Sequence, residues 1–133
     1  MRAAEHPARV SSTRPRGQRK IVYLVAPGGN PNYGDEFILR AWLRYLARVR
    51  PNADVVVDCH TPGQASVLLR AWHPRAVFVD TIWRICFQTA HLPAAEAIAL
   101  AAEVVHDPGR MPRIASGIEL LARADIVHVV GGG

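Results

Sequence analysis

Short apolar runs alternate along the chain with segments of helical periodicity. Within each run, apolar side chains fill both odd and even positions, which is typical of strands buried on both faces of a parallel sheet. The runs cover residues 20–26, 54–59, 76–80 and 125–130. Because a helical segment separates each run from the next, the pattern predicts βαβ units. The fold class that follows is α/β, with a Rossmann-like parallel sheet and helices on both of its faces.

The segment after the first strand has the clearest helical pattern. Its apolar residues recur at spacings that predict one buried stripe. They are Phe37, Ile38, Ala41, Trp42, Tyr45, Leu46 and Val49. Arg40, Arg44 and Arg48 form a separate polar row on the same helix. We therefore expect Trp42 and Tyr45 to belong to the core and not to a surface that stacks on a ligand.

Three further segments are predicted to be helices, and one segment fits two states. The helices are expected at Gly63–Trp72, Pro93–Val105 and Pro112–Arg123. The first of them is expected to bury Val67, Leu68, Ala71 and Trp72. Residues 81–90 fit a helix or a strand, and we assign them to a helix.

Charge is distributed unevenly along the chain. The formal net charge is +5, but residues 1–20 hold six basic residues and a single acid, Glu5, so the remainder is balanced. A neutral domain lacks the basic face that binds a phosphate backbone, which argues against a nucleic-acid partner. Residues 1–19 have no apolar core of a signal peptide, and we predict a disordered basic tail before a domain at 20–133.

The spacing of cysteines and histidines and the hydropathy of the chain argue against a disulfide, a metal site and a membrane span. Cys59 and Cys86 form no CxxC pair, and the histidines have no metal-binding spacing, so we predict reduced thiols and no metal. No apolar run approaches the roughly 18 residues of a membrane span, so no transmembrane segment is expected. These features indicate a cytoplasmic protein.

The first strand-to-helix loop has the glycine spacing of a phosphate loop without its cations. Gly29 and Gly34 are correctly spaced, but Asp35 and Glu36 stand where a phosphate loop has Lys and Ser or Thr. The dinucleotide fingerprint G-x-G-x-x-G is also absent. Asp58 ends the second strand, where a dinucleotide fold places its ribose-binding acid, but without that fingerprint we favour a strand-end residue that caps a loop.

The same loop resembles a known family. The run Asn32-Tyr33-Gly34-Asp35-Glu36 follows a strand and opens an amphipathic helix, which resembles the N-terminal signature of the polysaccharide pyruvyl transferases. Gly131-Gly132-Gly133, after the last strand, is similar to the second glycine-rich loop of that family. The resemblance covers roughly Ile21 to Gly133.

The resemblance implies a fold and an activity. Members have two Rossmann-type halves arranged as in GT-B-like transferases, and they move pyruvyl from phosphoenolpyruvate to a sugar as a ketal. The acceptor would be a saccharide of a cell-surface polysaccharide or its lipid-linked precursor, which suggests a position near the inner membrane face. Phosphoenolpyruvate is a donor substrate, so no cofactor is implied. The chain stops within the loop after its last strand, so we expect an N-terminal half that lacks its C-terminal half and is inactive alone.

The candidate site residues all lie after strands. We expect Asn32 and Gly34 to offer N–H donors to substrate, and Asp35 to act as general base or only as a helix cap. His60 either lines the same crevice or belongs to a surface loop. The glycines Gly131, Gly132 and Gly133 would let a ligand approach the backbone, or simply form a turn.

Two other functions remain open at this point. One is a GT-B-like glycosyltransferase half that uses a nucleotide sugar. The other is a non-catalytic, truncated remnant of such an enzyme.

Overall fold

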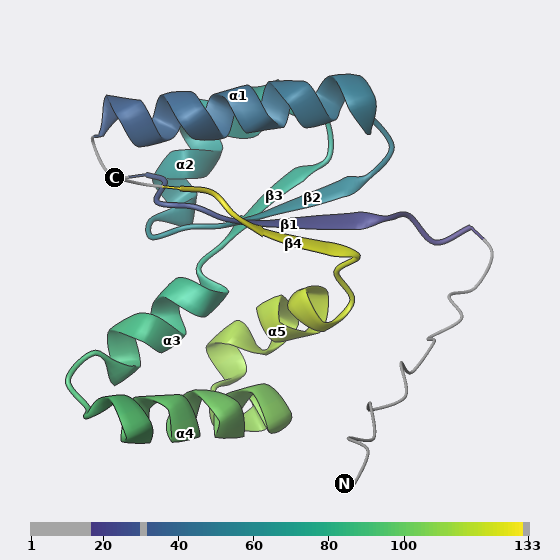
Figure 1. Cartoon of the computed structure of the whole chain (residues 1–133). Helices are drawn as coiled ribbons and strands as arrows, with labels where there is room; N and C mark the ends of the chain where they lie inside the picture. Colours follow the sequence, from purple (N-terminus) through teal and green to yellow (C-terminus); the bar gives the residue numbers. More distant parts are fainter. Residues whose placement is uncertain (1–16, 30–31, 132–133) are drawn as a thin grey trace, which may run out of the picture.

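The computed structural model describes residues 17–29 and 32–131 (Figure 1). The strands are β1 (Ile21–Val25), β2 (Asp54–Asp58), β3 (Ala76–Val79) and β4 (Ile126–Val129). The helices are α1 (Tyr33–Val49), α2 (Pro62–Leu69), α3 (Thr81–Thr89), α4 (Ala94–His106) and α5 (Ala115–Ala122). Short 3-10 turns lie at Arg70–Trp72, Pro108–Arg110 and Pro112–Ile114. All four expected strands are confirmed, and residues 81–89 are helical.

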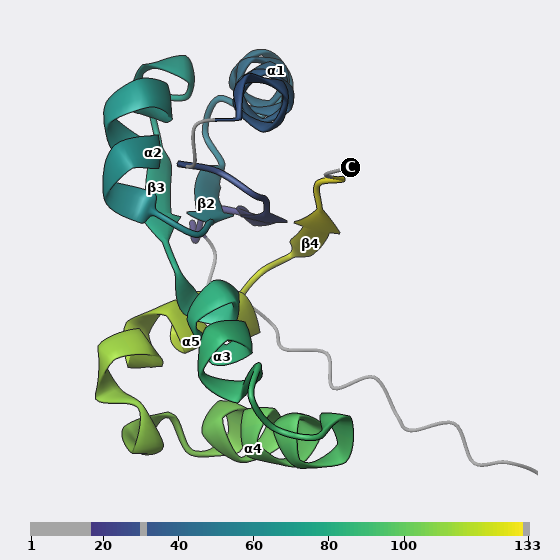
Figure 2. The same ribbon diagram turned by 90° about the vertical axis from the view of Figure 1, so that its left-hand side faces the viewer.

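The four strands form one parallel sheet in the order β3-β2-β1-β4. The chain therefore runs outward from β1 to β3 and then crosses back to the other side of β1. Helices α1 and α2 cover one face of the sheet, and α3 to α5 cover the other (Figures 1 and 2). Right-handed crossovers require this division. The chain moves across the sheet in one direction from β1 to β3 and in the opposite direction from β3 to β4, so the connecting helices lie on opposite faces. The Rossmann-like α/β fold is confirmed.

Alternate strand residues supply the two cores. On the α1 face, buried valines and leucines of β1 and β2 pack against Leu39, Leu43 and Leu46. On the other face, Ile21, Tyr23 and Val56 pack against side chains of α3 and α5. A third cluster joins α3, α4 and α5 without the sheet, through Ile85, Val104, Ile114 and Ile118.

The predicted buried stripe of α1 is largely wrong. The helix buries Leu39, Leu43 and Leu46, whereas Phe37 is 69% exposed and Tyr45 is 48% exposed. The leucines are themselves spaced for a helical face, so α1 carries two neighbouring apolar stripes that share Leu46. The sheet selects the leucine stripe and leaves the aromatic one on the flank of the helix. There Tyr45 is exposed, whereas Trp42 is half-buried and still packs against the core, as expected.

The predicted buried side of α2 is wrong for a related reason. Val67 is 81% exposed and Leu68 is also exposed, while Ala65 and Leu69 are buried. The α-helix ends at Leu69, and Arg70–Trp72 continues as a 3-10 turn with three residues per turn. Trp72 follows Leu69 by three residues and Ala65 by seven, so it lies on their side of the segment. Of the four residues expected to be buried, Trp72 is the one that packs against the α1-side core.

No helix in residues 17–29 and 32–131 is both long and apolar enough to cross a membrane. The expected tail falls mostly in residues 1–16, outside the described residues.

Two helical glycines provide a test of how α5 packs on α3. A Cβ at Gly117 would lie 1.8 Å from Oγ1 of the buried Thr81, whereas a Cβ at Gly63 would meet nothing within 4 Å. We expect Gly117→Ala to lower the free energy of unfolding by about 1–3 kcal/mol through overpacking. Gly63→Ala should raise it by about 0.5 kcal/mol through helix propensity. Urea denaturation measures both, and a Gly117→Ala variant as stable as the parent would contradict the close packing.

Candidate functional site

The order of the strands marks the carboxyl-terminal edge of the sheet, where all four parallel strands end, as the place for a site. The direction of strand addition reverses between β1 and β4, and in open α/β sheets ligands bind beyond the carboxyl ends of the strands at such a point. The two strands stay paired to this edge, where the N–H of Val130 donates to the carbonyl of Val25 at 2.8 Å. The start of α1 and the end of β4 lie at the same end of the sheet (Figure 1).

The loop after β1 is held against the loop after β2. Gly29 has a φ of +85°, and a Cβ there would lie 2.0 Å from Oγ1 of Thr61. Both the N–H and the hydroxyl of Thr61 donate to the carbonyl of Gly28 at 3.4 Å. Only glycine fits at position 29, because a side chain would be strained and would displace Thr61.

Asn32, Gly34 and Asp35 are brought together in the first turn of α1. Asn32 is the N-cap residue: its Oδ1 accepts from the N–H of Gly34 at 3.1 Å, and its Nδ2 donates to Oδ2 of Asp35 at 2.8 Å. The Gly34 N–H, which we expected to be offered to substrate, donates to this cap instead. Asp35 is half-buried, and its Oδ1 accepts no hydrogen bond from the described residues. One carboxylate oxygen thus remains available to a ligand.

His60 lies on the other side of the sheet from α1. Its ring centroid is 4.8 Å from that of Phe87 and 6.0 Å from that of Trp83, both on α3. The imidazole therefore lines the α3 side of the edge and not the Asn32–Asp35 turn. Gly131 is exposed directly after β4, and Gly132 and Gly133 lie outside the described residues.

A buried pair of polar side chains escaped the sequence analysis. The hydroxyl of Tyr23 donates to Oδ2 of Asp58 at 2.6 Å, and the N–H of Ile82 donates to the same oxygen at 2.7 Å. Neither Tyr23 nor Asp58 has exposed surface. Tyr23 pairs in register with Val56, so Asp58 lies on the same face two residues along β2. A tyrosine and an aspartate at that offset on neighbouring strands are the sequence signal that could have revealed the pair.

Asp58 has a structural role at the junction of β1, β2 and α3. Burial raises its pKa, and the hydrogen bonds from Tyr23 and from the start of α3 oppose that rise. Burial also raises the pKa of Tyr23, and the Asp58 carboxylate adds to the effect. The carboxyl is buried, and its Oδ2 caps the first turn of α3 by accepting from the N–H of Ile82. Its Oδ1 is also buried and has no hydrogen-bond partner among the described residues.

The thiol nearest the edge is not poised for nucleophilic chemistry. Burial, together with the negative charges of Asp58 and Asp80, raises the pKa of Cys59 to about 12. The thiolate is the reactive form, so Cys59 remains an inert thiol at neutral pH. Within the described ranges, no three side chains of His, Cys, Asp or Glu are grouped as ligands of a metal ion.

The two cysteines should differ sharply in reactivity. Cys59 is buried and has a raised pKa, whereas Cys86 is exposed on α3. We expect a maleimide at pH 7 to modify one thiol per native chain, at Cys86, and both thiols in urea. Mass spectrometry of the digested protein identifies the site. Rapid native labelling of Cys59 would show that the edge beside it opens.

The pH dependence of stability should reveal the buried carboxyl. Because the folded pKa of Asp58 is raised above 3.8, the folded state retains a proton that the unfolded chain releases. The contribution of Asp58 to the free energy of unfolding is therefore fully present below about pH 4 and falls as the pH rises through the folded pKa. Asp58→Asn keeps an acceptor for Ile82 but removes this dependence, so its stability relative to the parent should increase with pH. The exposed control Asp107→Asn should show no such trend in urea titrations from pH 4 to 7.

Comparison with protein-family models, with curated proteins and with solved structures gives no match to this chain. The features of the chain that bear on its function are therefore the carboxyl-terminal edge of the sheet and the sequence motifs that lie there.

Proposed function

We propose that this chain forms the N-terminal, Rossmann-type half of a polysaccharide pyruvyl transferase of GT-B-like architecture. One observation carries the proposal: the Asn32–Asp35 motif and Gly131 follow neighbouring strands, β1 and β4, at the point where the strand order reverses. That is where an open α/β sheet binds its ligand, and the two motifs are those that resemble the family.

The proposed reaction has two hydroxyl groups of the acceptor sugar attack one carbon. Both hydroxyl oxygens form bonds to C2 of phosphoenolpyruvate, and the bond from C2 to the phosphate oxygen breaks. One hydroxyl proton goes to the methylene carbon, which becomes the ketal methyl, and the other leaves with phosphate. Asp35 is the proposed general base for the first hydroxyl, through the Oδ1 that the cap leaves open.

The charges of the described edge favour the sugar over the donor. Asp35 and Asn32 offer a carboxylate and an amide, which suit neutral hydroxyl groups. On the α3 side of this edge, the cation Arg84 is paired with Asp80, the residue before α3, with 2.9 Å between Nε and Oδ2. Phosphoenolpyruvate is strongly anionic, so we infer that a C-terminal half supplies its cations. A lipid-linked acceptor would place the enzyme in the cytoplasm near the inner face of the membrane.

Ligand titration of the 133-residue chain separates the proposal from a glycosyltransferase half. We expect an acceptor saccharide to bind at best in the millimolar range, which corresponds to roughly −4 kcal/mol. Tighter binding of a UDP-sugar than of saccharide or phosphoenolpyruvate would favour the glycosyltransferase. Ketal formation by the purified chain alone would contradict the two-half arrangement, because a single half cannot enclose both substrates.

Asp35→Asn tests the role of the carboxylate in an enzyme assembled with the second half. The amide still faces Asn32 in the cap, so the free energy of unfolding should change by about 1 kcal/mol or less. If Asp35 is the base, turnover should fall roughly 10²-fold with little change in KM for the acceptor. Glu36→Gln is the matched control, because it removes a charge from the same turn. If Asp35→Asn turns over as fast as Glu36→Gln, Asp35 has a capping role only.

A further inference from the structure

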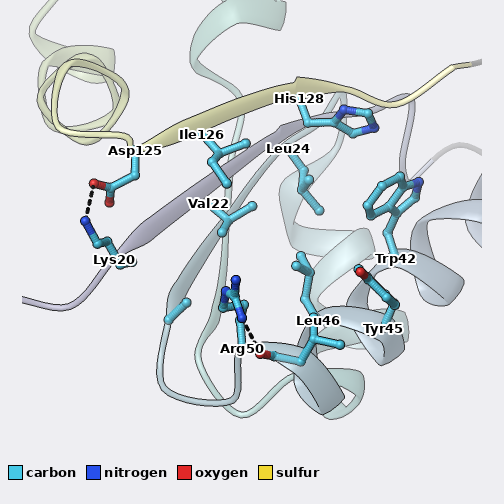
Figure 3. Close-up of a pocket in the computed structure, with 12 residues that line it drawn as sticks. Lys20, Val22, Leu24, Trp42, Tyr45, Leu46, Arg50, Asp125, Ile126 and His128 are labelled. Atoms are coloured by element: carbon cyan, nitrogen blue, oxygen red, sulfur yellow. Dashed lines mark hydrogen bonds and ion pairs between the residues drawn. The ribbon is translucent and has the colours of Figure 1, made fainter.

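An apolar groove runs between α1 and the outer strand β4 (Figure 3). Its cavity volume is about 500 Å³. Val22 and Leu24 of β1 and Ile126 and His128 of β4 form its floor, and Trp42 and Tyr45 of α1 form its wall. The His128 and Trp42 rings are 4.5 Å apart between centroids, so they close one end of the floor. We call this feature the α1–β4 groove.

The groove leaves large apolar side chains open to solvent. Ile126 is 56% exposed and Tyr45 is 48% exposed, and the apolar surface continues along α1 over Ile38 and Phe37. An apolar surface that is contiguous and concave marks an interaction site in soluble proteins. The aromatic stripe of α1, which the sheet leaves partly exposed, forms the wall of this site.

Extension of the sheet would not cover the groove. To reach a further parallel strand beside β4, the chain would move across the sheet in the same direction as it does from β3 to β4. The helices of the crossover from β3 to β4 lie on the face opposite α1. Right-handed crossover places the next helix on that same opposite face. The α1 side of β4 would remain open even in a larger sheet, so its occupant is not the next βαβ unit.

The rim of the groove carries an excess of positive charge. Arg48 lies on α1 beside Tyr45, with its guanidinium 5.9 Å from the Tyr45 ring centroid. Arg50 lines the end of the groove. Within residues 17–29 and 32–131, neither of these two arginines forms an ion pair. The one acid of the lining, Asp125, is bound to Lys20 and to the N–H of Ile21.

We propose that the α1–β4 groove binds an amphipathic helix of another protein, with its apolar face against Trp42 and Tyr45 and acidic residues toward Arg48 and Arg50. Helices dock into apolar grooves in this way, through side chains repeated every three to four residues. The concave shape favours a helix over a flat membrane surface. This proposal does not depend on the transferase function.

Charge excludes two alternative occupants. The N-terminal residues 1–16 are strongly basic and would be repelled by the arginines of the rim. A second copy docked by a two-fold axis along α1 would bring the two arginine rows together, which is unfavourable for the same reason. An acidic partner helix gains from both the apolar wall and the charged rim.

Two model peptides test the proposal on the full 133-residue chain. Both have 18 residues and the same leucine face, but one carries glutamates on its flanks and the other carries lysines. We expect the acidic peptide to bind at least about tenfold more tightly by fluorescence anisotropy, the size expected of a few rim ion pairs. The double variant R48E/R50E should reverse this preference.

Two further variants separate the groove from the rest of the surface. Tyr45→Asp should weaken binding of the acidic peptide about tenfold, whereas Val67→Asp, at an exposed apolar site on α2, should not change it. Circular dichroism confirms that each variant is folded. Both side chains are substantially exposed in the folded protein, so neither substitution buries a charge.

Three results would overturn the proposal. One is equal or no saturable binding of the two peptides to the parent chain. The second is a dimer of the parent chain that Tyr45→Asp dissociates, which would identify a second copy as the occupant. The third is binding to vesicles of phosphatidylcholine and phosphatidylglycerol that Tyr45→Asp abolishes while neither peptide binds, which would identify a membrane.

Discussion

One buried carboxyl group joins three elements of the fold. Asp58 sits at the end of β2, accepts a hydrogen bond from Tyr23 of β1, and accepts another from the start of α3. A buried carboxyl is costly unless it is hydrogen-bonded, so its partners must hold their positions whenever the chain is folded. This requirement fixes the offset of β1 against β2 on one face and the place where the return crossover begins. The position of β4, and with it the candidate site, depends on that crossover.

The other face of the same edge is organised by close packing and by a helix cap. Gly29 lets the loop after β1 lie against Thr61, and Asn32 then starts α1. Together, these two arrangements hold the loop after β1 and the start of α1 in place. The Oδ1 of Asp35 is one group that the first turn of α1 leaves available among the described residues. A site that depends on one such oxygen is specific about where a hydroxyl group can sit, but it supplies little binding energy by itself.

The sequence predicted the order and type of the elements well, because strand and helix periodicities differ and because crossovers in parallel sheets are right-handed. It failed on which side of α1 and α2 is buried. Leu39, Leu43 and Leu46 compete with an aromatic stripe of similar spacing, and only the tertiary contact with the sheet decides between them. The pairing of Tyr23 with Asp58 was missed because it depends on strand register. In the site, Asn32 and Asp35 were found from their positions after a strand, but the direction of the His60 ring depends on α3.

The third cluster of apolar residues has a consequence for the motions of the chain. Helix α4 lies farthest from the sheet (Figures 1 and 2) and buries a single residue, Val104, in a cluster shared only with its helical neighbours. Segments with few buried apolar contacts open locally at a free energy well below that of global unfolding. Amide hydrogens of α4 will therefore exchange with solvent before those of β1 and β2, and the helical layer will loosen while the sheet stays intact. The fold is thus divided into a rigid half at the sheet and a more labile half beneath it.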